Sequence, residues 1–260
     1  MPALIHPQAL VAAGARLAAG VRVGPFAVIE EDVEIGEGTS IAAHAVVKRY
    51  TRLGARNRVH EHAVIGGVPQ DVKFDPACVS SVEIGSDNIL REGVTVHRGS
   101  RPGSATRIGD GGFLMAQAHV AHDCIVGDQV VMANAATLGG EVVVQDRAFI
   151  SGLVGVHQFC RVGRCAMIGG LSKVVQDVLP FCITDGNPAR ARGLNLVGLR
   201  RAGFKAADIA ALKEAYRLLH QRVPLKEAAA RMRESPSEAV RELGAFIAAS
   251  KRGFAHPLAD

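Results

Sequence analysis

Aliphatic side chains recur at every sixth position through most of the chain. The first unbroken run of such positions is Ile5, Val11, Leu17, Val23, Ile29, Ile35, Ile41, Val47, Leu53, Val59 and Ile65. The register resumes at Ile84, Leu90 and Val96, and it holds again from Ile108 to Val174. A helical face repeats every three or four residues and an alternating strand every two, so neither explains this spacing. A period of six is typical of a parallel β-helix.

Each group of six residues supplies a short strand and a turn, and three groups make one triangular coil. Residues 18 apart in the chain then lie above one another, at roughly the 4.8 Å spacing of paired strands. The pattern predicts a mainly β fold, a left-handed parallel β-helix of about nine coils over residues 1–187. Aromatic residues make up only 4% of the chain and there is no Trp, which fits a thin core of branched aliphatic side chains.

Two segments interrupt the register, residues 66–82 and residues 98–107. The first contains Pro69 and Pro76, and the second contains Gly99, Pro102 and Gly103. Both are predicted to be loops that leave the body of the β-helix. Loops on a rigid scaffold often carry function, although an ordinary surface loop is an equally good interpretation of either segment alone.

The pattern changes to helical spacing near Phe204. Apolar residues with helical spacing predict helices over 206–219, 225–232 and 239–249, and Pro224 and Pro236 stand near the starts of two of them. We therefore expect residues 188–260 to form a C-terminal helical domain. Such a domain could cover the last coil, whose strand edges would otherwise be unpaired.

Composition excludes several classes of protein. The formal net charge is only +5, and no basic run with interleaved aromatics suggests a nucleic-acid partner. No apolar run is long enough to cross a membrane. The five cysteines are odd in number and form no CxxC pair, which argues against a disulfide framework or a structural zinc site. A cytoplasmic location is expected.

The segment around His122 and Asp123 is the best candidate for chemistry. A histidine beside a carboxylate is a plausible general base, and an ordinary surface histidine is the competing interpretation. Gln158 is 36 residues beyond His122 and therefore lies two coils further along the same column. Asp123 lies above Glu141 by the same arithmetic. His119 and His122 are three apart and do not obviously point at one ion, so no metal site is predicted.

The residues at this point resemble a known family, the acyl-carrier-protein-dependent UDP-N-acetylglucosamine O-acyltransferases of lipid A biosynthesis. The resemblance spans nearly the whole chain. Its most specific motifs are Pro69-Gln70-Asp71-Val72-Lys73, His119-Val120-Ala121-His122-Asp123-Cys124 and His157-Gln158-Phe159. It implies that a 3-hydroxyacyl chain moves from acyl carrier protein to the 3-hydroxyl of UDP-N-acetylglucosamine.

The resemblance also implies roles for individual residues. His122 would be the general base, Asp123 would orient it, and a backbone N–H near Gly140 would hold the oxyanion. Met167 and Gly170 match the region that limits acyl length. The substrate-binding positions would be Gln70, Asp71, Lys73, His97, His119, Glu141, His157, Gln158, Asn195 and Arg201. No cofactor is implied beyond the phosphopantetheine that arrives on the carrier protein, and the family implies a homotrimer.

Three positions depart from the family's pattern. Glu141 stands where a histidine is usual, Val197 where a glutamate is usual, and Ala202 where the second of two arginines is usual. These differences leave two other enzymes open: one that acylates a 3-amino sugar nucleotide, and one that takes an acyl-CoA donor. A non-enzymatic scaffold would not require a His–Asp pair.

Overall fold

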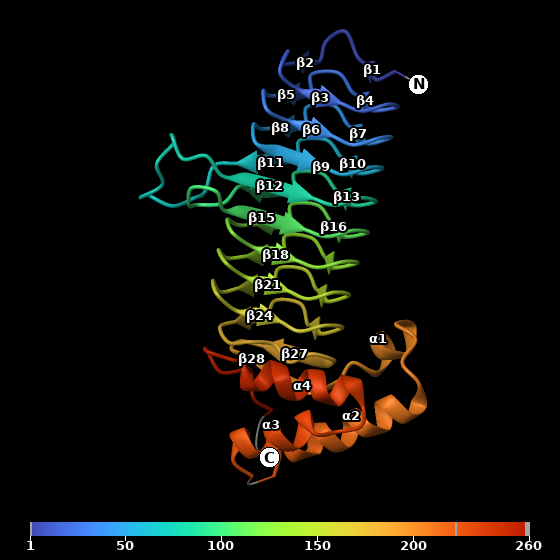
Figure 1. Ribbon diagram of the computed structural model, residues 1–260, viewed down its shortest axis with the longest axis vertical. Coiled ribbons are helices and arrows are strands. Elements are labelled where there is room, and N and C mark those ends of the chain that lie inside the picture. Colours follow the sequence, from blue (N-terminus) through green and yellow to red (C-terminus); the bar gives the residue numbers. More distant parts are fainter. Residues whose placement is uncertain (1, 222, 258–260) are drawn as a thin grey trace.

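The computed structural model describes residues 2–221 and 223–257. Within them, short strands form three sheets that wind around one axis, and four helices follow at the C-terminal end (Figure 1). Every strand pair is parallel except the last, β27 with β28. In Figure 1 the front strands run from left to right and the chain returns behind them as it descends, so the coils are left-handed. The predicted left-handed parallel β-helix is confirmed.

The three sheets are the three faces of the prism, here called A, B and C. Face A contains β1 (Leu4–Ile5), β4 (Arg22–Val23), β7 (Ser40–Ile41), β10 (Arg58–Val59), β13 (Ile89–Leu90), β16 (Phe113–Leu114), β19 (Val131–Met132), β22 (Phe149–Ile150), β25 (Met167–Ile168), β27 (Cys182–Gly186) and β28 (Ala189–Leu194). Face B contains β2 (Leu10–Val11), β5 (Val28–Ile29), β8 (Val46–Val47), β11 (Val64–Gly67), β14 (Thr95–His97), β17 (His119–Val120), β20 (Thr137–Leu138), β23 (Gly155–Val156) and β26 (Lys173–Val174). Face C contains β3 (Arg16–Leu17), β6 (Glu34–Ile35), β9 (Thr51–Leu53), β12 (Ser81–Ile84), β15 (Ala105–Ile108), β18 (Ile125–Val126), β21 (Val143–Val144) and β24 (Arg161–Val162).

The core is the column of side chains at the sixth positions. From Val23 to Val174 each of these side chains is buried. The three sixth positions of the first coil, Ile5, Val11 and Leu17, are less buried, because no described coil covers them from above; Ile5 is 46% exposed. The period of six therefore predicts which side chains point inward, whereas burial also requires a neighbouring coil.

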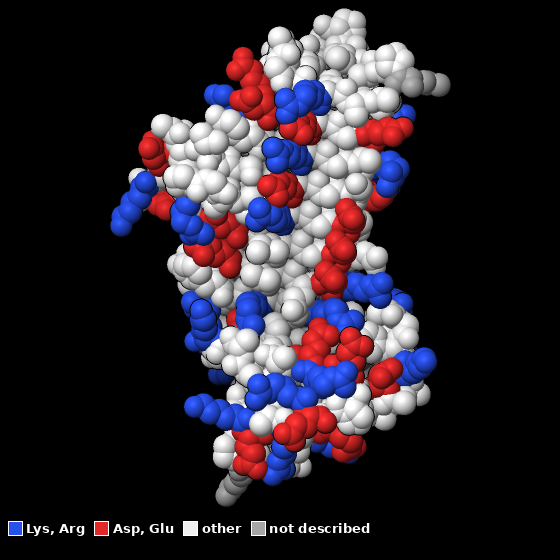
Figure 2. All heavy atoms as spheres, in the orientation of Figure 1, with Lys and Arg blue, Asp and Glu red and all other residues white. Residues whose placement is uncertain are grey.

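The outer surfaces of faces A and C differ in character. On face C the outward positions Arg16, Glu34, Arg52, Glu83 and Arg107 follow one another in register, and Figure 2 shows the resulting alternation of positive and negative charge. On face A the outward positions of five consecutive coils are apolar. They are Ile89, Phe113, Val131, Phe149 and Met167.

Both loops leave the prism at the corner between faces B and C. Residues 68–80 connect β11 to β12, and residues 98–104 connect β14 to β15. The ends of the predicted segments, 66–82 and 98–107, belong to the flanking strands because they still pair with neighbouring coils. Arg98 ties the two loops together: its Nη1 donates to the Cys78 carbonyl at 3.0 Å.

The C-terminal helices cover the last coil. They are α1 (Leu196–Arg201), α2 (Ala206–Leu218), α3 (Leu225–Arg233) and α4 (Glu238–Ala248). A second apolar core joins the helix residues to Leu179, Phe181 and Cys182 of the last coil. Helix α1 was not expected from the sequence, and the predicted boundary at 187/188 falls inside the β27–β28 hairpin. Among the described helices, none combines the length and hydropathy of a membrane span.

Candidate active site

His122 and Asp123 occupy a turn at the corner between faces B and C. Asp123 adopts the left-handed conformation, with φ of 59°, as do Glu141 and Phe159 at the same place in the next two coils. The turn therefore repeats the geometry of the β-helix, with no special distortion. It directs the His122 side chain outward, where it stays about one-fifth exposed, while the Asp123 side chain is buried.

The two side chains are hydrogen-bonded to each other. His122 Nδ1 lies 2.8 Å from Asp123 Oδ2. The same oxygen accepts hydrogen bonds from the Ser100 backbone N–H at 2.9 Å and from the Ser100 hydroxyl at 2.6 Å. Since a carboxylate can only accept, Nδ1 carries the proton and Nε2 keeps its lone pair. The arrangement is that of an oriented general base.

Asp123 is held in its ionised form. Burial raises the pKa of this carboxyl, but hydrogen bonds from Ser100 in the 98–104 loop and from His122 outweigh burial and lower the pKa to about 2. A carboxylate that remains charged can fix the imidazole tautomer and stabilise the imidazolium that forms when His122 takes a proton.

Gly140 lies one coil below His122, directly under its ring. The Gly140 N–H is not hydrogen-bonded to any of the described residues. A Cβ at this position would lie 2.5 Å from His122 Nε2, so only glycine leaves room for the imidazole. The site therefore offers a base and a free backbone donor side by side.

Two further histidines lie above His122 on face B. His119 Nδ1 is hydrogen-bonded to Thr95 Oγ1 at 2.7 Å, and the His97 ring contacts the His119 ring edge-on at 4.7 Å between centroids. Burial lowers the pKa of His97 to about 4 and also lowers that of His119. Both are thus neutral at pH 7 and can exchange hydrogen bonds with an uncharged ligand.

His157 and Gln158 lie two coils below His122 at the same corner, and both are exposed. Gln70, Asp71 and Lys73 are exposed as well, in the 68–80 loop that leaves this corner, where the Asp71 carboxylate accepts a hydrogen bond from the Lys73 N–H. The structure therefore brings eight of the predicted polar site residues to one corner of the prism, together with the His122–Asp123 pair. They are Gln70, Asp71, Lys73, His97, His119, Glu141, His157 and Gln158.

Asn195, Arg201 and Met167 lie elsewhere. They line a separate hollow of about 740 Å³ beside face A, together with Phe149 and Val197. Face A is opposite the corner between faces B and C, so one copy of the chain does not unite this hollow with His122. Asn195 also caps helix α1, because its Oδ1 accepts from the Gly198 N–H and its Nδ2 donates to the Cys165 carbonyl. Gly170 lies at a third place, the corner between faces A and B.

Sequence reasoning missed the residues that hold Asp123 from above. Ser100 binds Asp123, and Arg101 is ion-paired with Glu141 at 2.8 Å. The register contained a signal for this loop. Val96 and Ile108 are twelve residues apart where six would be expected, so the six additional residues leave the prism at the corner that also carries His122. Cys124 and Cys160 are buried packing residues, and burial raises the pKa of their thiols to about 12 and about 11.

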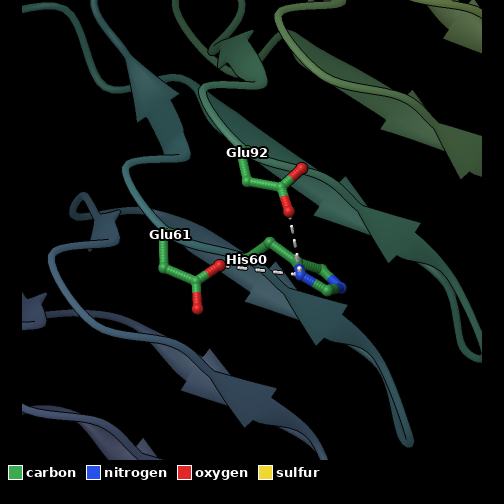
Figure 3. Close-up of side chains that lie close together, drawn as sticks. All are labelled: His60, Glu61 and Glu92. Carbon is green, nitrogen blue, oxygen red and sulfur yellow. Dashed lines mark ion pairs between the residues drawn. The ribbon is translucent and has the colours of Figure 1, made fainter.

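A second group of chemically active side chains lies at the corner between faces A and B. His60, Glu61 and Glu92 point toward one another in Figure 3, with His60 Nδ1 at 3.7 Å from an oxygen of each carboxylate. These three side chains are of a type that binds metal ions. However, Glu92 already receives two hydrogen bonds from Arg91, at 2.9 and 3.0 Å. A metal ion would have to compete with that guanidinium.

Comparisons with known proteins agree on one family. Residues 177–255 match a family model described as "Udp N-acetylglucosamine O-acyltransferase; Domain 2", and residues 14–49 match the bacterial transferase hexapeptide (six repeats). An acyl-[acyl-carrier-protein]–UDP-N-acetylglucosamine O-acyltransferase of Verminephrobacter eiseniae is 48% identical over 257 residues, which cover 96% of this chain and 98% of the relative.

Two other comparisons extend this result. A Synechocystis protein of the same name is 50% identical over 158 residues, 61% of this chain, and the match covers less than two thirds of that relative, 57%. The solved structure of a UDP-N-acetylglucosamine acyltransferase from Francisella novicida superposes with a TM-score of 0.94 at 33% identity, covering 96% of this chain and 93% of that one. The similarity therefore covers both the β-helix and the helical domain.

Proposed function

The chain belongs to the family of acyl-[acyl-carrier-protein]–UDP-N-acetylglucosamine O-acyltransferases, and on that premise we propose the reaction it catalyses. It transfers a 3-hydroxyacyl chain from acyl carrier protein to the 3-hydroxyl of UDP-N-acetylglucosamine, the first step of lipid A biosynthesis. The observation that carries this proposal is the His122–Asp123 pair, joined at 2.8 Å at a corner that two loops overhang.

His122 acts as the general base. Its Nε2 takes the proton from the sugar 3-hydroxyl while the hydroxyl oxygen attacks the thioester carbonyl. Asp123, ionised because its pKa is about 2, holds Nδ1–H and stabilises the imidazolium. When the tetrahedral intermediate collapses, the carbon–sulfur bond breaks, and the imidazolium returns the proton to the leaving phosphopantetheine thiolate.

Gly140 supplies the oxyanion donor. Gly140 lies against the His122 ring, and its N–H is not used by the described parts of the fold. A preorganised donor of this kind stabilises a developing oxyanion by about 3–4 kcal/mol. The reaction requires no resident cofactor, because the reactive thioester arrives on the phosphopantetheine of the carrier protein.

The acceptor and donor sites extend from this corner. His97, His119 and Gln158 offer uncharged hydrogen-bonding groups to the sugar, and the exposed 68–80 loop adds Asp71 and Lys73. Arg201 and Asn195 belong to the nucleotide end of the site. Because these two residues lie beside the opposite face, the complete site requires a neighbouring subunit.

A homotrimer would provide that neighbour. The apolar outward positions of face A, from Ile89 to Met167, give a surface that favours contact with another copy. Sedimentation equilibrium measures the mass of the assembly directly. A monomer at assay concentration would contradict the shared site.

The test of the function is turnover with defined substrates. Purified protein receives 3-hydroxyacyl carrier proteins of several chain lengths, with UDP-N-acetylglucosamine or its 3-amino analogue, and mass spectrometry identifies the product. An ester that disappears in His122→Ala supports the proposal. If the only product is an amide, the acceptor is a 3-amino sugar nucleotide. Turnover only with acyl-CoA would overturn the assignment of acyl carrier protein as the donor, and no turnover with any donor would indicate a non-enzymatic scaffold.

A further inference from the structure

Arg101 lies between two carboxylates at the edge of the catalytic turn. Its Nη1 is 2.8 Å from Glu141 Oε1, and its Nη2 is 3.7 Å from Asp123 Oδ1. Arg101 belongs to the 98–104 loop, whereas the two carboxylates belong to consecutive coils below it. The guanidinium thus connects the loop to both coils of the site.

The two oxygens of Asp123 are used unequally. Oδ2 accepts the hydrogen bonds from Ser100 and His122, whereas Oδ1 is buried and has no hydrogen-bond partner among the described residues. The group of opposite charge that faces Oδ1 is the Arg101 guanidinium. A buried carboxylate oxygen without a hydrogen bond is costly unless a nearby positive charge compensates it.

Glu141 adds a negative charge one coil below Asp123, beside the residue that lies under the base. Its backbone N–H donates to the His122 carbonyl at 3.0 Å, so its side chain starts from the turn one coil further along. A second carboxylate beside a His–Asp pair would favour the protonated imidazole, so that less of the base would be free to take the substrate's proton at a given pH. The positive charge of Arg101 offsets the negative charge of Glu141. The net charge of Arg101, Glu141 and Asp123 together is therefore the same as that of Asp123 alone.

We propose that Arg101 is a positioning residue of the acyl transfer: paired with Glu141, it closes the 98–104 loop over Asp123 and cancels the charge that Glu141 places beside His122. This inference rests on the proposed function, because it assigns His122 the role of base. Arg101 touches no reacting atom and acts through Asp123 and His122.

A plain surface ion pair would look similar but behave differently. The Arg101 side chain is 58% exposed and that of Glu141 33%, and pairs this exposed contribute little to stability. Loss of such a pair would not change how His122 titrates. The test must therefore follow the protonation of His122, with stability measured only as a control.

The charged and titratable groups near His122 come from every element packed around it. Asp123 is adjacent, Glu141 and Arg101 face it from the next coil and the loop, and His97 and His119 approach from face B. His157 lies two coils below. Replacement of Arg101 changes one of these groups and leaves the others in place.

The experiment compares the pH profile of kcat/KM for wild type, Arg101→Ala, Glu141→Gln and the double variant, with Arg101→Lys as the conservative replacement. In Arg101→Ala the acidic limb should move to higher pH by about half a unit to one unit, so that activity below the limb falls about threefold to tenfold. The double variant should return the limb to its wild-type position. Arg101→Lys should keep it there. Arg56→Ala, which removes a remote pair with Asp87, should have no effect.

A second measurement does not depend on turnover. NMR of protein labelled at histidine follows the His122 imidazole, assigned by its loss in His122→Gln, and its pKa should rise in Arg101→Ala and return in the double variant. An unmoved His122 pKa in Arg101→Ala, or a double variant no nearer to wild type than the single one, would overturn the role of Arg101. If the NMR shifts appear but wild type transfers no acyl group, the proposed function fails and the charge coupling remains.

Discussion

The His122 imidazole lies against the backbone of Gly140 so closely that a Cβ at residue 140 would come within 2.5 Å of both Cε1 and Nε2. The turns of two consecutive coils are thus matched to each other. One turn carries His122, the base, and the next has a glycine, without a side chain, at the position directly below it. The same contact brings the Gly140 residue beside Nε2, the atom that is proposed to receive the proton. The spacing between base and oxyanion donor is fixed by the stacking of the coils.

Gly140→Ala should disable the site without unfolding the β-helix. The methyl group would push the imidazole away from its position, and a misplacement of about 1 Å can cost about a hundredfold in rate. We expect kcat to fall by roughly that factor while the circular dichroism spectrum is unchanged. Gly14→Ala is the matched control, since its Cβ would meet nothing closer than 3.7 Å and Gly14 lies at the same corner in the first coil, several coils away from His122. Full activity in Gly140→Ala would contradict the contact.

Asp123→Asn should lower turnover far more than it lowers stability. The amide would present N–H donors to Nδ1 and favour the tautomer that carries its proton on Nε2, which cannot act as a base. A comparable change in a Ser–His–Asp triad costs about ten-thousandfold in kcat, and we expect a loss of about a thousandfold or more. Steady-state kinetics measures it. Asp32→Asn, which breaks only an exposed pair with Arg49, should retain wild-type turnover.

The six-residue register predicted the β-helix well, because the spacing between neighbouring aliphatic residues determines which side chains point inward. Leu114, Val120 and Val126 belong to three faces of one coil, and all are buried. The spacing could not predict the exposure of Ile5, which depends on whether a neighbouring coil covers it, or helix α1, whose first turn is capped by the Asn195 side chain.

The site was predictable only in part. The order of the coils places His122, Gly140 and Gln158 in one column, and the structure has them so. The six-residue register could also have assigned Met167 to face A. Met167 directly precedes the inward Ile168, and Ile168 is 54 residues, or three full coils, beyond Leu114 of face A. The contacts of Arg101 could not be predicted. The register shows where a loop leaves the prism, but it does not show which residues the side chains of that loop contact.

Gly170→Leu should shorten the preferred acyl chain. A Cβ at Gly170 would have only ordinary contacts, the nearest to the Gly152 carbonyl at 3.5 Å, so a side chain can be added there without strain and would extend outward from the corner. If the acyl chain passes along this corner, the added isobutyl group blocks its far end. Competition between carrier proteins bearing long and short 3-hydroxyacyl chains, read by mass spectrometry, should show reversed preference. An unchanged length distribution would place the chain elsewhere.

The buried His97 should make the protein sensitive to moderate acid. Its pKa is about 4 in the folded state because burial disfavours the charged ring, against an ordinary value of 6.5. The unfolded state therefore binds this proton more readily, and stability that is fully present above pH 6.5 is lost as the pH falls from 6.5 through about 4. The difference, 6.5 minus 4, sets an upper limit of about 3 kcal/mol.

His97→Gln should remove much of that sensitivity. Glutamine does not titrate, so the denaturant midpoint of the variant should fall less between pH 7 and about pH 4.5 than that of wild type, at one fixed protein concentration. His44→Gln is the control, because His44 is exposed at another corner, where its ring stacks on His62. Because the lowered pKa of His119 acts in the same direction, some acid sensitivity should persist in His97→Gln. Equal midpoint shifts in wild type and His97→Gln would mean that His97 is protonated at little cost, and that its ring is open to water at the face where the acceptor sugar is proposed to bind.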